Sequence, residues 1–163
     1  MAIHNERRKL HYSAQQLFEL IAQVERYPEF LPLWHQVKVS KNEQNDSGQR
    51  VYITDQLIQV GPFYKRFRTK TILEPFHRIH IVSSDPLFRQ FSIDWLFLPG
   101  KKLPGKELPG KELSNQECCQ IDFKLNCEAS SVFLRPVFDI ALMDTARSIV
   151  SAFEDRARSI YDH

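Results

Sequence analysis

Two acidic residues interrupt apolar strand patterns and are the first candidates for chemistry. Asp55 lies on the same side of a predicted strand as Ile53 and Leu57, which predicts that its carboxyl group faces the interior. Burial would raise the pKa of that group, as in a general acid, a general base or a polar anchor. Asp94 lies on the side opposite to Trp95, so we expect its carboxylate on the solvent-facing side of its strand.

The other reactive residue types are too scattered to form a metal or catalytic site. Of six histidines only His77 and His80 lie close together, and the three cysteines form no Cys-x-x-Cys pair, so the spacing of a closed metal site is missing. Ser130 and Ser131 precede a helical pattern and are predicted to cap it. Five glycines leave little material for a phosphate-binding loop. We therefore predict no metal and no catalytic cofactor.

A row of residues that we call the basic row marks one face of a predicted strand. It comprises Tyr64, Arg66, Arg68 and Lys70. The row suits contact with anionic lipid or RNA, and it equally suits the solvated outer face of a sheet. The formal net charge is only +2, from 22 basic and 20 acidic residues. This balance excludes a protein that holds DNA mainly by charge.

Strands must position these residues, because period-two alternation dominates between residues 37 and 127. The clearest case places five apolar side chains on one face: Cys119, Ile121, Phe123, Leu125 and Cys127. The intervening residues are mostly polar, which is typical of an antiparallel sheet with one buried face. Similar alternation covers 63–71, 79–81 and 91–97, with turns predicted at 42–48 and at Gly61-Pro62.

Helices are predicted on both sides of this strand region. After a first strand over 2–12, Ser13 and Gln16 have the spacing of a capping box, and apolar residues follow at helical intervals. Two prolines predict a short bent segment over 27–34. The last helix carries an apolar stripe: Phe138, Leu142, Ala146, Ile149, Phe153, Ala157 and Ile160. This order predicts an α+β fold, with a curved antiparallel β-sheet and the long C-terminal helix in its concave face.

The chain of 163 residues has the size of one domain, which we assign to residues 1–163. The unit Leu-Pro-Gly-Lys-Glu occurs twice within 100–115 and predicts an inserted surface loop. The N-terminus lacks the apolar region of a signal peptide, and we expect no membrane-spanning segment. Adjacent Cys118 and Cys119 would point to opposite faces of a strand, so we expect no disulfide framework and a cytoplasmic location.

Four stretches of the chain carry a family resemblance. They are His11 to Pro32, HYSAQQLFELIAQVERYPEFLP; Phe67 to Leu73, FRTKTIL; Trp95 to Pro99, WLFLP; and Phe153 to Tyr161, FEDRARSIY. Together they resemble the coenzyme-Q-binding START-like proteins, in the family's order and over nearly the whole chain. The combination of Tyr-Pro-x-Phe-Leu-Pro, Trp-x-Phe-x-Pro and Phe-Glu-x-Arg-Ala carries the resemblance.

The resemblance implies a helix-grip fold (START-like, Bet v 1-like) whose sheet and long helix enclose an apolar cavity. Members of the family are described as binding ubiquinone or related isoprenoid lipids and as supporting respiratory electron transfer as chaperones, not as catalysts. A bacterial branch is described as a toxin that blocks association of ribosomal subunits. The wider superfamily also contains polyketide cyclases and hydrolases. Ubiquinone is therefore the implied ligand, with ribosome binding and a cyclase-type or hydrolase-type activity as the alternatives.

Apolar residues on the inner faces of the predicted elements are the candidate ligand-binding residues. On the sheet they are Phe67, Ile81, Phe91, Ile93, Trp95, Phe97, Ile121, Phe123 and Leu125. On the long helix they are Phe138, Leu142 and Ile149, and at a predicted mouth they are Tyr27, Phe30, Leu31 and Trp34. In sequence a cavity wall looks like plain core, and both interpretations fit these residues. An exposed apolar lip at the mouth would give peripheral contact with the inner face of the cell membrane.

Overall fold

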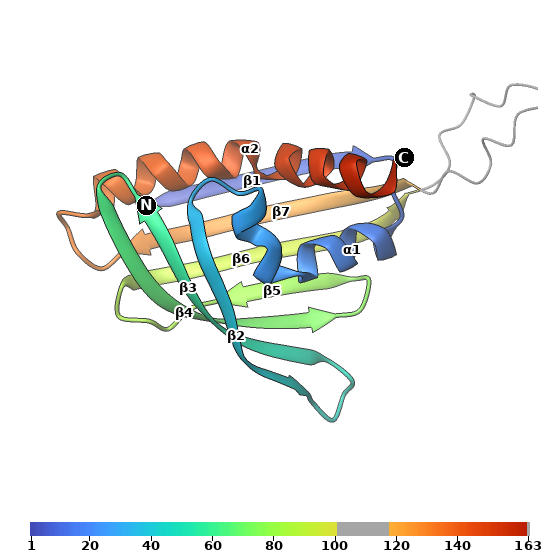
Figure 1. Cartoon of the computed structure of the whole chain (residues 1–163), viewed down its shortest axis with the longest axis horizontal. Helices are drawn as coiled ribbons and strands as arrows, with labels where there is room; N and C mark the ends of the chain where they lie inside the picture. Colours follow the sequence, from blue (N-terminus) through green and yellow to red (C-terminus); the bar gives the residue numbers. More distant parts are fainter. Residues whose placement is uncertain (101–117, 163) are drawn as a thin grey trace, which may run out of the picture.

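The computed structural model describes residues 1–100 and 118–162, which form a seven-stranded antiparallel sheet with a long helix against it (Figure 1). The strands are β1 (Ala2–Leu10), β2 (Trp34–Gln44), β3 (Arg50–Val60), β4 (Phe63–Glu74), β5 (Arg78–Val82), β6 (Phe88–Gly100) and β7 (Cys118–Ala129). The helices are α1 (Ala14–Ala22), the short 3-10 helix η1 (Val24–Glu29) and α2 (Arg135–Tyr161). The predicted α+β fold is confirmed.

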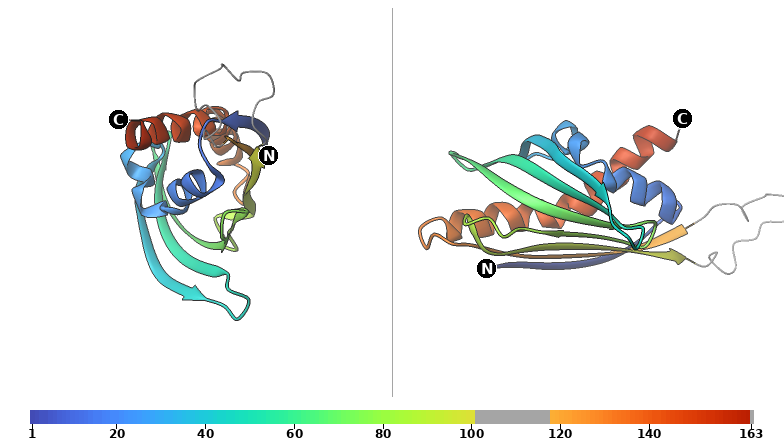
Figure 2. Two further views of the ribbon diagram at one scale, coloured as in Figure 1. Left: turned by 90° about the vertical axis from the view of Figure 1, so that its right-hand side faces the viewer. Right: turned by 90° about the horizontal axis from the view of Figure 1, so that it is seen from below.

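The strand order β1-β7-β6-β5-β4-β3-β2 makes the first and the last strands of the chain neighbours. In this ladder Ala2 lies opposite Cys127, and Leu10 lies opposite Cys119. The sheet curves around α1 and α2, which both lie on its concave side, and the β2–β3 hairpin projects beyond the rest of the sheet (Figure 2). This arrangement places the interior of the protein between the curved sheet and the two helices.

Alternation along the strands explains which face is buried. On β7 every second residue from Cys119 to Cys127 is buried, because the apolar face packs toward α2 while the polar face meets solvent. β4 and β6 follow the predicted alternation in the same way. The hairpin turn predicted at 42–48 is shorter in the structure, because β2 continues to Gln44 and β3 begins at Arg50.

Local sequence also explains where the two α-helices begin. Ser13 Oγ accepts a hydrogen bond from the Gln16 N–H at 3.0 Å, and the Gln16 side chain accepts one from the Ser13 N–H at 3.0 Å, so the predicted capping box is confirmed. Pro136 lies in the first turn of α2, where its missing N–H costs no hydrogen bond. The predicted apolar stripe on α2 is buried as far as Ala157, but Ile160 in the last turn is 36% exposed.

Two predictions about the domain's extent stay predictions. The inserted loop predicted at 100–115 lies, beyond Gly100, outside the described residues. The assignment of one domain to 1–163 is not tested by the described residues alone. None of the helices in the described part of the chain is long and apolar enough to cross a membrane.

Candidate ligand-binding site

The interior between the sheet and α2 contains a small enclosed cavity, which we call the inner cavity. Its walls are Leu33, Trp34, Ile58, Phe67, Phe88, Phe91, Ile93, Phe123, Leu125, Leu142, Thr145, Ala146 and Ile149. Its volume is about 20 Å³, enough for about one water molecule. Since ligand pockets measure about 300–1,000 Å³, side chains fill most of the predicted apolar cavity in this closed state.

The structure buries every candidate ligand-binding residue except Phe30, which is partly exposed. Those that line the inner cavity are Trp34, Phe67, Phe91, Ile93, Phe123, Leu125, Leu142 and Ile149. Those that lie in the surrounding core are Tyr27, Leu31, Ile81, Trp95, Phe97, Ile121 and Phe138. The structure thus brings half of the candidates to one cavity, and a ligand-binding role for them stays a prediction.

Some wall residues are missing from the sequence-based candidates. The clearest case is Phe88, which is buried and lines the inner cavity but lies an odd number of positions from Phe91. A register shift between Phe88 and Gln90 explains this, because a β-bulge there turns the Phe88 side chain to the inner face, where Phe91 also lies. Ala146 belongs to the predicted helical stripe, so its spacing relative to Leu142 already carried the signal.

Aromatic rings fill the space where α2 begins. The Phe88 ring centroid lies 5.0 Å from that of Phe67, 4.8 Å from that of Phe91 and 6.0 Å from that of Phe138. Edge-to-face and tilted pairs at such distances add about 0.5–1.5 kcal/mol each beyond the area that they bury. We call these four rings the aromatic cluster, and three of them, Phe67, Phe88 and Phe91, form part of the wall of the inner cavity.

In the predicted mouth at residues 27–34, three of the five large apolar side chains are buried and the other two, Phe30 and Leu33, are partly exposed, so an apolar lip there stays a prediction. Tyr27, Leu31 and Trp34 are 6%, 2% and 9% exposed. The Tyr27 hydroxyl donates a hydrogen bond to the Ile21 carbonyl, and burial raises the pKa of Tyr27. Tyr27 lies in η1 and packs against α2, with its ring centroid 5.5 Å from that of Phe153. The ring of Phe30 at the surface is covered in part by the Arg156 guanidinium, 5.2 Å from its centroid.

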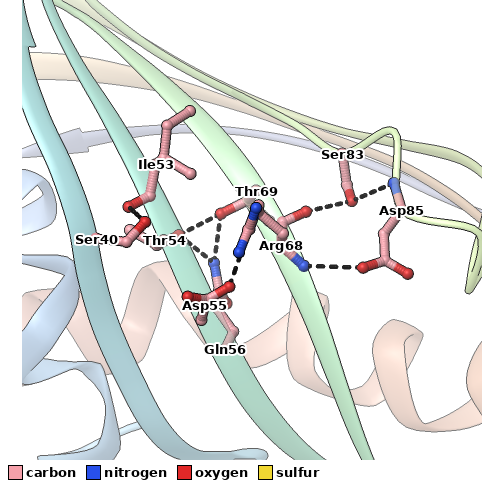
Figure 3. Close-up of polar contacts among 9 residues, drawn as sticks. All are labelled: Ser40, Ile53, Thr54, Asp55, Gln56, Arg68, Thr69, Ser83 and Asp85. Atoms are coloured by element: carbon pink, nitrogen blue, oxygen red, sulfur yellow. Dashed lines mark hydrogen bonds and ion pairs between the residues drawn. The ribbon is translucent and has the colours of Figure 1, made fainter.

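The inner faces of β3 and β4 carry a cluster of polar residues that we call the polar strip. It comprises Thr54, Gln56, Thr69 and Thr71, which are the buried polar side chains of the described residues. Trp34 Nε1 donates to Gln56 Oε1 at 2.7 Å, and Gln56 Nε2 donates to Thr69 Oγ1 at 2.8 Å. The hydroxyls of Thr54 and Thr69 also bond each other across the two strands (Figure 3). The alternation of Thr69 and Thr71 with Phe67 was the sequence signal for this strip.

The prediction that Asp55 faces the interior is wrong. Its neighbours Thr54 and Gln56 occupy the inner face, so Asp55 lies on the outer face and binds Arg68, with Nε 3.1 Å from Oδ1 (Figure 3). The outward apolar residues Ile53 and Leu57 made the pattern of β3 appear inverted. Asp94 lies on the outer face, as predicted, where it binds Arg78.

The basic row lies on the outer face of β4, across the sheet from the polar strip. Tyr64, Arg66, Arg68 and Lys70 are all exposed. With Lys38 of β2 the three basic residues line a hollow of about 890 Å³ that also reaches the loop between β5 and β6. In that loop the Asp85 carboxylate accepts a hydrogen bond from the Arg68 N–H at 3.1 Å (Figure 3). The solvated interpretation and the anion-binding interpretation both remain consistent with this position.

A groove that is larger than the inner cavity but smaller than the hollow at the basic row opens on the concave side, between α1 with η1 and the projecting β2–β3 hairpin. We call it the hairpin groove, and its volume is about 620 Å³. Its apolar lining includes Phe18, Ala22, Tyr52, Leu73 and Phe76, and its rim carries charged side chains. This volume falls within the range of ligand pockets. No group of three or more His, Cys, Asp or Glu within 1–100 and 118–162 is placed to hold a metal ion.

Comparisons with known proteins agree with this architecture. Residues 10–154 match the family model described as polyketide cyclase/dehydrase and lipid transport. This protein belongs to that family. The fold matches a START superfamily protein from Mycobacterium smegmatis with a TM-score of 0.72 at 12% identity, over 98% of this chain and 99% of that one. The START-like fold that the sequence resemblance implies is therefore confirmed.

Two relatives point to different roles within the family. The ribosome association toxin RatA of Escherichia coli K12 is 27% identical over 150 residues, which covers 92% of this chain and 83% of the toxin. The mitochondrial coenzyme Q-binding protein COQ10 homolog B of Xenopus laevis is 25% identical over 161 residues, which covers 97% of this chain and 59% of that protein. The chain is thus similar both to a toxin and to a quinone-binding protein.

Proposed function

We propose that this protein binds an isoprenoid quinone, ubiquinone in the first instance, and acts as a lipid chaperone for respiratory electron transfer rather than as an enzyme. The observation that carries the proposal is the composition of the interior. Its walls are aromatic and aliphatic, and its buried polar side chains gather in one strip on β3 and β4. An amphiphile with a small polar head and a long apolar tail matches this arrangement, with the head at the polar strip and the tail against the apolar walls.

The energetics favour such a ligand even though the inner cavity is closed. Burying about 500 Å² of an apolar tail contributes about 12 kcal/mol before the costs of association. Opening the interior requires aromatic rings to move, and the hairpin groove of about 620 Å³ gives the polar head a route from solvent. In this proposal the protein lies in the cytoplasm and takes up quinone at the inner face of the membrane.

The direct test is extraction of the purified protein into organic solvent, followed by mass spectrometry. We expect a quinone in the extract and a saturable titration with added ubiquinone. A useful control is Ala146→Leu, which adds three carbon atoms to a cavity wall that is 2% exposed. We expect this variant to fold and to retain less quinone. Wild-type protein that carries no lipid and shows no saturation with quinone would contradict the proposal.

Ribosome association is a second candidate function, favoured by the exposed basic row. Three positive side chains on one strand face, beside Lys38, offer a site for the phosphates of RNA. The similarity to the ribosome association toxin adds support over 92% of the chain. In this alternative the outer face of β4, not the interior, would carry the function.

Sucrose-gradient profiles of cells that overexpress the protein test this alternative. If it is correct, the fraction of joined ribosomes falls, and the double variant Arg66→Glu, Arg68→Glu restores it. The double variant Lys9→Glu, Lys124→Glu is the matched control, because it changes the net charge equally and both lysines are exposed on the outer faces of β1 and β7, away from the basic row. Profiles unchanged by the wild-type protein would exclude ribosome association. An equal effect of the control variant would show that net charge, not the basic row, is responsible.

A further inference from the structure

The hydrogen bonds of the polar strip have a fixed direction. An indole N–H can only donate, so Trp34 fixes the Gln56 carbonyl oxygen toward itself and the Gln56 amide nitrogen toward the threonines. That nitrogen lies 2.8 Å from Thr69 Oγ1 and 3.3 Å from Thr54 Oγ1. Both hydroxyl oxygens therefore accept a hydrogen bond from Gln56, so each hydroxyl proton needs an acceptor other than Gln56.

Counting the protons shows that the strip has a surplus of donors. The Thr54 and Thr69 hydroxyls have one proton each, and the bond between them uses one. No acceptor for the other proton lies among the described residues. Thr71 Oγ1 is fully buried and has no hydrogen-bond partner at all in the described part of the chain. A buried polar group without a partner costs about 1–3 kcal/mol, so these donors are suited to an acceptor that arrives with a ligand.

The electrostatics of the strip select a neutral acceptor. All four side chains are uncharged, and the sheet separates them from the basic row on the outer face. An anionic carboxylate or phosphate in this interior would lose its hydration without gaining a cation. A ketone or quinone carbonyl has the two lone pairs that the free hydroxyls need, and it has no charge to bury.

The strip also lies at the right place for a head group. Thr71 lies opposite Tyr52, and Tyr52 lines the hairpin groove. At the other end Gln56 lies opposite Phe67, which lines the inner cavity. The strip therefore joins the groove that opens to solvent with the apolar interior that would hold a tail.

We propose that the polar strip recognises a carbonyl oxygen of the ligand's head group, with the hydroxyls of Thr71 and of the Thr54–Thr69 pair as the donors. This inference rests on the proposed lipid-binding function and specifies its chemistry. It predicts that the protein prefers a neutral carbonyl-bearing head group to an anionic one. It also assigns Gln56 and Trp34 a positioning role toward the head group, because they orient the hydroxyls and donate no hydrogen bond to its carbonyl oxygen.

The test compares three probes by titration against tryptophan fluorescence: ubiquinone with a ten-carbon tail, a hydrocarbon of similar length without oxygen, and a fatty acid of similar length. We expect the quinone to bind about 5–150-fold more tightly than the other two, because two hydrogen bonds of about 0.5–1.5 kcal/mol each sum to about 1–3 kcal/mol. Thr71→Val should raise the Kd of the quinone by about 3–10-fold and leave that of the hydrocarbon unchanged. Ser148→Ala is the control and should leave the Kd of the quinone unchanged, since Ser148 carries an exposed hydroxyl on α2 and lines neither the inner cavity nor the hairpin groove.

A stability measurement separates recognition from a structural role. Because Thr71 Oγ1 has no partner within the described residues, Thr71→Val should leave the Tm of the ligand-free protein unchanged or raise it. A loss of quinone affinity with unchanged Tm supports the inference. If Thr71→Val and Thr69→Val both bind quinone as the wild type does, the inference about the polar strip is wrong, although lipid binding itself still stands. Tighter binding of the fatty acid than of the quinone has the same meaning. Failure of all three probes overturns the proposed function itself.

Discussion

Phe88→Ala is the substitution that examines the interior most directly, because it removes the central ring of the aromatic cluster. Phe88 is 6% exposed, and three other rings lie within 6.0 Å of its centroid. Those rings are fixed to β4, β6 and α2, so they cannot collapse fully into the space that is left. The expected cost is about 3–5 kcal/mol of unfolding free energy. For a chain of this length, each kcal/mol lowers Tm by about 2–4 °C, which gives a fall of about 6–20 °C.

Urea unfolding followed by circular dichroism measures this cost, with the m-value unchanged if only packing is lost. Phe133→Ala is the control, since the same substitution at a side chain that is 92% exposed should change stability by no more than about 0.5 kcal/mol. The enlarged cavity should also bind benzene, as dry apolar cavities do, so benzene should restore part of the lost Tm in Phe88→Ala and none in the wild type. A loss below about 1 kcal/mol would refute the packing described for the aromatic cluster.

Three further predictions concern other parts of the molecule. Ser13→Ala should lower the free energy of unfolding by about 1 kcal/mol, because it removes the capping box. Ser13→Asp, measured in the same thermal melts, should keep most of the stability that the cap contributes; equal Tm values for the wild type and both variants would contradict a stabilising cap. Burial raises the pKa of Cys119 to about 11 and that of Cys127 to about 12, so at pH 8 about one Cys119 thiol in a thousand is ionised. Iodoacetamide labelling followed by peptide mass spectrometry should therefore be slow at pH 8, rise with pH and become fast in urea; rapid labelling of the native protein at pH 8 would show that these thiols are accessible. Asp55→Asn should change the free energy of unfolding by less than about 1 kcal/mol, because its partner Arg68 is 67% exposed. It should also leave quinone binding unaltered; a loss of quinone affinity would show that Asp55 takes part in ligand binding.

Sequence alone predicted the fold well where local and global preferences agree. On β7 apolar and polar residues alternate strictly, so the buried face of that strand followed at once. The same logic failed on β3, where Thr54 and Gln56 point inward and Ile53 points outward. The prediction assumes that the buried face of a strand is apolar. On β3 the buried face is partly polar, because its polar side chains hydrogen-bond to one another, and such exceptions concentrate at functional sites. The inverted pattern of β3 was thus itself a signal of the polar strip.

The size of the interior was beyond sequence reasoning for a different reason. The sequence shows which side chains face inward, but the cavity volume depends on how rings such as Phe67 and Phe88 pack in three dimensions. The bulge at Phe88 also has no local marker, because it depends on the pairing of β6 with β7. The bent segment at 27–34 was predicted, yet its burial depends on α2, which lies more than 100 residues later in the chain.

The pairing of β1 with β7 has a consequence for how the protein is made. β1 ends at Leu10, but its partner strand is complete only at Ala129. At a synthesis rate of about 5–20 residues per second, the nascent first strand waits about 6–24 s for that partner. During this interval β2 to β5 can pair as successive hairpins, whereas β1 has no strand to pair with on that side. Closure of the sheet is therefore a late folding event that depends on a non-local contact, and we expect this step to limit the folding rate.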